Sequence, residues 1–259
     1  MCGIYGTTLS HHKELLVKKI NYLKKRGPDF QDVINYGQVT LGHTRLSIID
    51  LDERSNQPFD YGDLTITFNG EIYNFLELKK GLIKEGYKFE TTSDTEVICA
   101  LYHSKGKKCV DFLNGMFAFV IYDKKENVLF GARDRLGKKP FYYYYDENDL
   151  EFSSSLYAVA CGNNLELDRN TIKSYLEWGY VPDPMSMFKK TYKLEPGYAF
   201  CFNLNNRNFK KWQYWDIPQS KYEDITFSNA LDELDSILNK SVKSRMISDV
   251  SLGVFLSGG

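Results

Sequence analysis

The sequence predicts an α+β fold in which β-sheets are sandwiched between helices. Between Cys2 and about Trp215, strand patterns outnumber helical patterns, and the helical patterns occur in pairs rather than after every strand. A doubly wound sheet would instead alternate strand and helix regularly. The chain has 259 residues, and at about 150 residues per domain it has room for one large domain and part of a second.

Three helices are predicted in the first half of the chain. The apolar spacing from Leu16 to Leu23 is helical and stops at Gly27-Pro28. The spacing from Phe75 to Leu82 predicts a second amphipathic helix that ends at Gly86. Ser93-Asp94-Thr95-Glu96 has the Ser-x-x-Glu pattern of a capping box and marks the start of a third helix.

Strand patterns fill most of the remaining sequence up to about residue 205. The run from Met116 to Tyr122 is apolar on both faces, as a strand covered on two sides would be. Hairpin turns are predicted at Asp123 to Asn127 and at Asp146 to Asp149. The other predicted strands are Thr65 to Phe68, which leads into the turn-prone pair Asn69-Gly70, Pro140 to Tyr145 and Tyr198 to Leu204.

The last part of the sequence differs in pattern from the rest. Residues 206–224 are polar and predict a linker between a domain at 2–205 and the start of another at 225–259. An amphipathic helix from Leu231 to Val242 is followed by a buried-strand pattern at Val250 to Leu256. Because one helix and one strand cannot bury their own faces, residues 225–259 are expected either to pack on the main domain or to begin a larger second domain that is cut off at its first strand–loop junction.

Composition excludes several classes of protein. Apolar residues make up 42% and charged residues 26%, which argues against wholesale disorder. Lysine plus arginine (33) nearly balances aspartate plus glutamate (34), so no nucleic-acid or membrane partner is expected. Five scattered cysteines do not form a disulfide framework, and four histidines without ligand spacing predict no metal site. No signal peptide is visible, and a cytoplasmic location is expected.

Cys2 is the first candidate for catalysis. Removal of Met1 would leave a thiol and an α-amine on the same residue. An α-amine with a pKa of about 7.7–8.0 is well matched to a thiol with a pKa of about 8.5. The amine could therefore act as the internal base of a cysteine nucleophile. The alternative is a cysteine that is simply packed or exposed near a chain end.

Three further positions carry suitable chemistry, each with a structural alternative. The guanidinium fork of Arg45 suits a carboxylate ligand, or else a surface salt bridge to Asp50 or Asp52. Asn69-Gly70-Glu71 offers an amide and an uncovered backbone N–H, the donors of an oxyanion hole, or else a plain turn. Asp94 is favoured in a first helical turn by the helix dipole alone, and it gains a function only if an ammonium group is bound nearby.

A series of short motifs runs through nearly the whole chain. In order they are Met1 to Gly6, Arg26 to Asp29, His43 to Asp50, Asn69 to Asn74, Ser93 to Glu96, Gly115 to Phe119, Arg133 to Gly137, Glu195 to Gly197 and Tyr214-Trp215. Together they resemble the glutaminase domain of glutamine-hydrolysing asparagine synthetases. The final Gly253 to Gly259 resembles the start of that family's pyrophosphate loop.

The resemblance implies a four-layer αββα N-terminal-nucleophile hydrolase sandwich, followed by the truncated start of an α/β synthetase domain. It implies hydrolysis of glutamine to glutamate and ammonia through a cysteinyl thioester, with Cys2 as nucleophile and Asn69 and Gly70 as oxyanion donors. It assigns the glutamine α-carboxylate to Arg45 and the ammonium group to Asp94 and Glu71. The implied pocket wall is the backbone of Leu46, Ser47, Ile48 and Ile49.

The resemblance also implies cofactors and partners. Glutamine is the expected small-molecule substrate, and the glutaminase reaction needs no cofactor. ATP and Mg²⁺ would serve the synthetase half of the complete protein, which could form a homodimer. Ser257, Gly258 and Gly259 would supply only the first N–H groups of a phosphate cradle. We therefore expect no appreciable ATP binding by a chain that is expected to be a fragment or a truncated product.

Two other functions remain open. The first is an amidotransferase of the same N-terminal-cysteine class with another acceptor, such as a sugar phosphate or phosphoribosyl pyrophosphate. Leu46-Ser47-Ile48 and Glu71 to Asn74 favour the synthetase type over these relatives. The second is a catalytically idle regulatory or scaffold domain, which an assay for ammonia release distinguishes from an enzyme.

Overall fold

The computed structural model describes residues 1–219 and 225–256 and contains two six-stranded antiparallel sheets. Strand order in the first sheet is β10-β8-β9-β1-β3-β2, with β1 (Gly3–Thr7), β2 (Phe30–Asn35), β3 (Thr40–Arg45), β8 (Tyr142–Tyr145), β9 (Leu150–Ser153) and β10 (Thr191–Lys193). Strand order in the second is β12-β11-β7-β6-β5-β4, with β4 (Phe59–Tyr61), β5 (Leu64–Ile72), β6 (Gly115–Asp123), β7 (Val128–Arg133), β11 (Tyr198–Asn203) and β12 (Phe209–Gln213).

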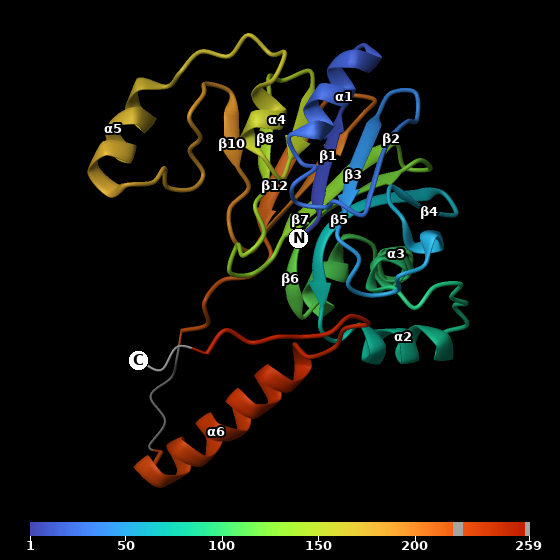
Figure 1. Ribbon diagram of the computed structural model, residues 1–259, viewed down its shortest axis with the longest axis vertical. Helices are drawn as coiled ribbons and strands as arrows, with labels where there is room; N and C mark the ends of the chain where they lie inside the picture. Colours follow the sequence, from blue (N-terminus) through green and yellow to red (C-terminus); the bar gives the residue numbers. More distant parts are fainter. Residues whose placement is uncertain (220–224, 257–259) are drawn as a thin grey trace.

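Helices cover the outer face of each sheet (Figure 1). The α-helices are α1 (Lys13–Asn21), α2 (Phe75–Lys84), α3 (Asp94–Lys105), α4 (Leu156–Ala160), α5 (Arg169–Trp178) and α6 (Phe227–Ser244), with short 3₁₀ turns at Glu53–Ser55 and Gly106–Phe112. α1 and α4 pack on the first sheet through a small cluster around Tyr5 and Ile20. α2 and α3 pack on the second sheet, and the two sheets face each other across a third cluster around Phe152 and Phe200. These layers confirm the predicted αββα sandwich.

β5 runs further than the sequence predicts. Asn69-Gly70 was expected to form a turn after Phe68, but β5 continues to Ile72, and Asn69 and Gly70 pair with Ala118 and Phe117 of β6. A Cβ atom on Gly70 would lie 2.2 Å from the carbonyl oxygen of Met116. The glycine is therefore required by the close approach of β6 rather than by a turn.

The predicted capping box forms only in part. The Ser93 side chain caps α3 by accepting a hydrogen bond from Thr95 N at 3.1 Å. The Glu96 carboxylate does not return to Ser93, since it accepts from the N–H groups of Glu90 (3.0 Å) and Thr91 (2.8 Å). Glu96 thus fixes the turn that leads into α3 and, with it, the position of Asp94.

The region predicted to be a linker contributes to the second sheet. β12 lies within residues 206–224 and pairs with β11, with Phe209 and Trp212 packed against opposite hydrophobic clusters. Lys210 and Lys211 stand between these two aromatic residues, so the sequence shows no strand alternation there. Residues 220–224 lie outside the described part of the chain.

The last predicted elements are only partly formed. α6 has the predicted apolar stripe, and its five residues Leu231, Leu234, Ile237, Leu238 and Val242 are exposed. The strand predicted at Val250 to Leu256 is not formed, because within the described residues it has no partner strand to pair with. None of the helices in the described ranges is long and apolar enough to cross a membrane.

Candidate active site

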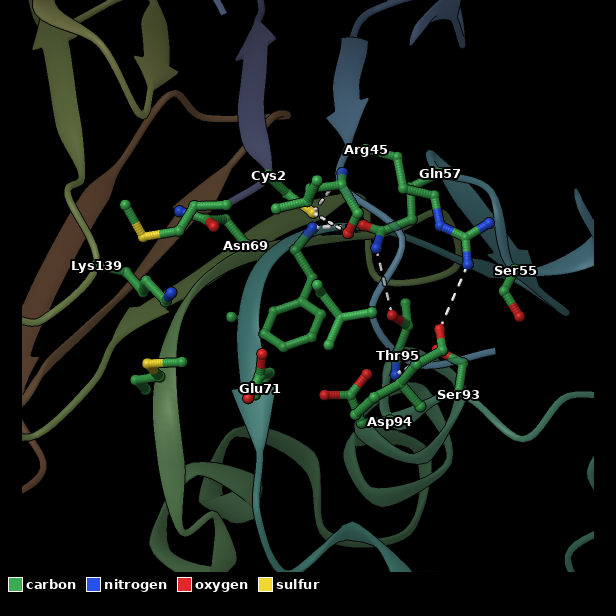
Figure 2. Close-up of a pocket in the computed structure, with 17 residues that line it drawn as sticks. Cys2, Arg45, Ser55, Gln57, Asn69, Glu71, Ser93, Asp94, Thr95 and Lys139 are labelled. Atoms are coloured by element: carbon green, nitrogen blue, oxygen red, sulfur yellow. Dashed lines mark hydrogen bonds between the residues drawn. The ribbon is translucent and has the colours of Figure 1, made fainter. Parts of the chain in front are cut away.

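A cavity of about 290 Å³ lies where β1, β3 and β5 approach the first turn of α3. Of the residues predicted to form the site, it is lined by Cys2, Arg45, Leu46, Ile48, Ile49, Asn69, Gly70, Glu71 and Asp94. Ser47 is not part of the lining, and its N–H donates to Asp29 Oδ2 at 2.8 Å. Ser257, Gly258 and Gly259 lie outside the described residues. Figure 2 shows Arg45 and Lys139 on opposite sides of this cavity.

Cys2 directly precedes β1. Its sulfur contacts the backbone of Leu46, the residue that follows β3. Sγ accepts from Leu46 N at 3.4 Å and lies 3.6 Å from Leu46 O. Burial raises the pKa of the Cys2 thiol, although the Leu46 N–H and the nearby N-terminal charge oppose this effect. Burial lowers the pKa of the Met1 α-amine, and the charges of Lys139 and Arg26 lower it further. Because the thiolate is the nucleophilic form, a cysteine in this environment would need a base to act as a nucleophile, and an amine at this position is suited to that role.

The side-chain amide of Asn69 is completely buried beside Cys2 and has no hydrogen-bond partner among the described residues. Both Oδ1 and Nδ2 are unpaired. An unsatisfied buried polar group costs about 1–3 kcal/mol, and such groups are rare in folded proteins. The cost is recovered if a ligand oxygen accepts a hydrogen bond from Nδ2.

The Gly70 N–H faces the cavity because of its position along β5. In an antiparallel pair, alternate residues direct both N–H and C=O toward the same neighbour. On the side of β5 away from β6, Gln57 Oε1 accepts from Phe68 N at 2.6 Å, and His43 Nε2 donates to Phe68 O at 3.0 Å. On the same side, Asp94 Oδ2 accepts from Ile72 N at 2.9 Å. Gly70 lies between these two capped positions, and its N–H is left for a ligand.

Arg45 is buried at the end of β3, and none of the residues in the described ranges forms an ion pair with it. Its guanidinium donates to uncharged oxygens only: Nη1 to Asp52 O (2.9 Å) and Asn56 Oδ1 (2.8 Å), and Nη2 to Ile49 O (3.4 Å) and Asp50 O. The carboxylate of Asp50 pairs instead with Arg54 at 3.4 Å. The alternative of a surface salt bridge to Asp50 or Asp52 is therefore not what forms. The positive charge of Arg45 has no anionic partner among the described residues, and a carboxylate ligand would bind it through Nε–H or by replacing some of these oxygen acceptors.

Asp94 and Glu71 bring negative charge to the same cavity. Burial raises the pKa of Asp94 to about 7, and the charge of Glu71 also raises it, while the hydrogen bond from Ile72 N opposes both effects. Burial likewise raises the pKa of Glu71. Neither carboxylate forms an ion pair within the described residues. An ammonium group bound between them would compensate both charges.

Lys139 and Gln57 line the cavity but were not predicted from the sequence. The Lys139 backbone is held on both sides, because its N–H donates to Asp134 Oδ2 at 3.0 Å and its C=O accepts from Arg133 Nε at 2.8 Å. Burial lowers the pKa of its side chain. The only sequence signal for Lys139 was the motif Arg133 to Gly137, which ends two residues before it. The lining is completed by Met1, Ser55, Phe68, Ser93, Thr95 and Met116.

Comparison with known proteins gives matches over the whole chain. Residues 1–215 match the glutamine amidotransferase domain family, and residues 233–259 match the asparagine synthase family. A relative in Methanocaldococcus jannaschii is 40% identical over 288 residues, covering 100% of this chain and 55% of its own length. The glutamine-hydrolysing asparagine synthetase 3 of Bacillus subtilis is 36% identical, with 100% of this chain and 44% of the relative covered. The chain thus spans about half the length of these relatives.

The fold also has solved counterparts. A glutamine phosphoribosylpyrophosphate amidotransferase from Bacillus subtilis superposes with a TM-score of 0.59 at 19% identity, over 83% of this chain and 49% of that one. At this identity the likeness concerns the fold alone, and it supports the two-sheet sandwich between helical layers. From the match over residues 1–215, the chain belongs to the glutamine amidotransferase domain family.

Proposed function

We propose that this chain hydrolyses glutamine to glutamate and ammonia through a γ-glutamyl thioester on Cys2. The observation that carries the proposal is the buried side-chain amide of Asn69, which lines the same cavity as Cys2. Among the described residues, neither its oxygen nor its nitrogen has a hydrogen-bond partner. The same cavity holds an uncompensated Arg45 and the acidic pair Glu71 and Asp94. Its volume suits a ligand the size of an amino acid.

The proposed reaction begins with Cys2 at the N-terminus after loss of Met1. The Cys2 α-amine takes the thiol proton, and the sulfur attacks the side-chain carbonyl carbon of glutamine. Asn69 Nδ2 and Gly70 N–H donate hydrogen bonds to the oxyanion that forms. The protonated amine then gives its proton to the leaving nitrogen, the C–N bond breaks and ammonia departs. Water attacks the thioester, releasing glutamate and restoring the thiol.

Substrate recognition follows from the distribution of charge. Arg45 binds the glutamine α-carboxylate, while Asp94 and Glu71 bind its α-ammonium group, and Leu46, Ile48 and Ile49 form the wall between them. A simple amide would leave these buried charges without partners, and such unpaired groups give strong discrimination against the wrong substrate. The α-carboxylate and the α-ammonium group of glutamine are therefore both bound while its side-chain amide lies at Cys2.

The test is ammonia release from glutamine by the wild type, Cys2→Ala and the control Cys161→Ala. We expect release by the wild type and the control, and none by Cys2→Ala. In thermal shift measurements Cys2→Ala should still be stabilised by glutamine, since Arg45 and Asp94 are intact. Turnover by Cys2→Ala, or a wild type that neither binds nor hydrolyses glutamine, would contradict the proposal.

For the complete protein we propose the role of an asparagine synthetase, in which the ammonia amidates aspartate with ATP and Mg²⁺. The match of residues 233–259 to the asparagine synthase family supports this assignment over other acceptors. Ser257, Gly258 and Gly259 would contribute backbone N–H groups toward the ATP phosphates. A cytoplasmic location is proposed with it.

A further inference from the structure

The segment that follows α6 returns to the wall of the glutamine pocket. We name residues 245–250 the strap. The Arg245 guanidinium lies over the Tyr73 ring, 4.7 Å from its centroid, and Ile247 packs against the hydrophobic cluster of α2 and α3. Asp249 N donates to Ile48 O at 2.9 Å, and Asp249 Oδ2 accepts from Asp50 N at 2.7 Å. Figure 1 shows the end of α6 directed toward α2, where the strap begins.

Asp50 connects the strap to both charged parts of the pocket. Its carbonyl oxygen accepts from Arg45 Nη2, and its Oδ2 accepts from Thr92 N at 2.7 Å, two residues before Asp94. Its N–H is the group that donates to Asp249. Asp50 has a φ of +51°, a conformation that is unfavourable for most residues other than glycine. Hydrogen bonds on its N–H, C=O and carboxylate therefore hold it in place together.

From these contacts we propose that Asp249 is a positioning residue for glutamine binding, acting through Asp50 on the orientation of Arg45. The proposal rests on the proposed role of Arg45 as the α-carboxylate ligand. In the described part of the chain, Arg45 donates only to oxygens of the loop between β3 and β4, namely three carbonyls and the Asn56 side-chain amide. Its guanidinium therefore follows the position of that loop. Asp249 contacts that loop at both Ile48 and Asp50, and it lies on the segment that follows α6. A shift of the strap therefore changes glutamine affinity without touching Cys2.

The variants Asp249→Ala, Asp249→Asn and the control Asp235→Ala test this proposal. The asparagine side chain keeps an oxygen that accepts from Asp50 N, whereas alanine does not. Asp235 lies on an exposed part of α6. We expect Asp249→Ala to raise KM for glutamine about three- to tenfold, the size of one hydrogen bond, with kcat unchanged. Asp249→Asn and Asp235→Ala should keep the wild-type KM.

Two further measurements separate positioning from a loss of structure. Hydrogen exchange at the Asp50 amide should be faster in Asp249→Ala than in the wild type, and unchanged in Asp249→Asn and Asp235→Ala. This measurement does not require an active enzyme. In an Arg45→Lys background, Asp249→Ala should add little to KM, because residues that act through one another are not additive.

The outcomes are distinct. An unchanged Asp50 exchange rate or an unchanged KM in Asp249→Ala overturns the proposal, as does a full additive effect with Arg45→Lys. Faster exchange in a chain that hydrolyses no glutamine would support the anchoring by Asp249 while contradicting the proposed function itself.

Discussion

Asp94 Oδ2 accepts a hydrogen bond from Ile72 N at 2.9 Å, which ties the first turn of α3 to the strand that carries Asn69 and Gly70. The proposed ammonium site and the proposed oxyanion hole are thereby fixed relative to each other. Burial of the carboxyl group disfavours its charged form and raises the pKa of Asp94 to about 7.

Glutamine binding is expected to weaken as the pH falls through about 7. Below that value Asp94 is protonated in the unliganded protein and no longer attracts the substrate ammonium group. KM should therefore rise toward acidic pH in the wild type, measured as ammonia release over a series of buffers. Asp94→Asn should show a high KM that lacks this pH dependence. An unchanged KM across this range in the wild type would exclude Asp94 as the ammonium ligand.

The same carboxyl group is expected to destabilise the fold at alkaline pH. Its folded pKa is raised above its unfolded value of about 3.9, so the destabilisation is fully present above about pH 7 and disappears as the pH falls toward that lower value. Asp94→Asn should thus raise the free energy of unfolding at alkaline pH, by up to about 4 kcal/mol, and change it little under acidic conditions. Urea unfolding of the wild type and of Asp94→Asn, each at one acidic and one alkaline pH, measures this difference. A variant that is less stable than the wild type at alkaline pH would contradict the prediction.

Replacement of Asn69 should separate activity from stability. Asn69→Leu removes an oxyanion donor, which typically costs about 2.7–4 kcal/mol in the transition state, or a 10²–10³-fold loss in kcat. Since Asn69 has two unpaired buried polar atoms, the same change should stabilise the fold by about 1–3 kcal/mol. Asn163→Leu is the contrast, because the Asn163 amide donates to Glu151 and to Val159 O at 2.7 Å each. That variant should be less stable and still active.

Replacement of Arg45 should act mainly on glutamine affinity. Arg45→Ala removes the proposed carboxylate ligand, and the loss of a buried charged partner costs about 2 kcal/mol or more, which corresponds to a KM at least about 30-fold higher. Arg45→Lys keeps the charge but not the planar guanidinium with its several donors, and it should be intermediate. Arg169→Ala, on the exposed start of α5, is the control. A kcat effect without a KM effect would argue against this role.

A buried ion pair holds β1 in the sandwich. Lys19 Nζ lies 2.7 Å from Glu151 Oε1 with both side chains fully buried, and the hydroxyl of Tyr5 on β1 donates to the same carboxylate at 2.8 Å. Lys19→Met leaves that carboxylate without its cation and should cost about 3–5 kcal/mol of folding free energy. Lys19→Met combined with Glu151→Gln should recover part of this loss in urea unfolding. A single variant as stable as the wild type would contradict the assignment.

Several of the strands and most of the helices follow from short sequence patterns, whereas the residues of the candidate site were assigned through the family resemblance. The hairpin turns at Asp123 to Asn127 and Asp146 to Asp149 lie between β6 and β7 and between β8 and β9, as predicted. The capping motif gave the start of α3. These features are local, so apolar spacing and turn chemistry are enough to predict them.

What the sequence did not predict depends on contacts between distant segments. The Asn69-Gly70 pair has the composition of a turn, but pairing with β6 keeps it in the strand. Lys139 enters the cavity because Arg133 and Asp134 hold its backbone. Asp249 meets Asp50 across 199 positions. No local pattern contains this information.

The central claim is that an N-terminal Cys2, with thiol and α-amine on one residue, splits the glutamine amide. Its most direct test is intact-mass spectrometry combined with ammonia release on the same preparation. The account predicts that active molecules begin at Cys2 and that molecules with a blocked or extended N-terminus release no ammonia. Full turnover by molecules that retain Met1 would contradict it.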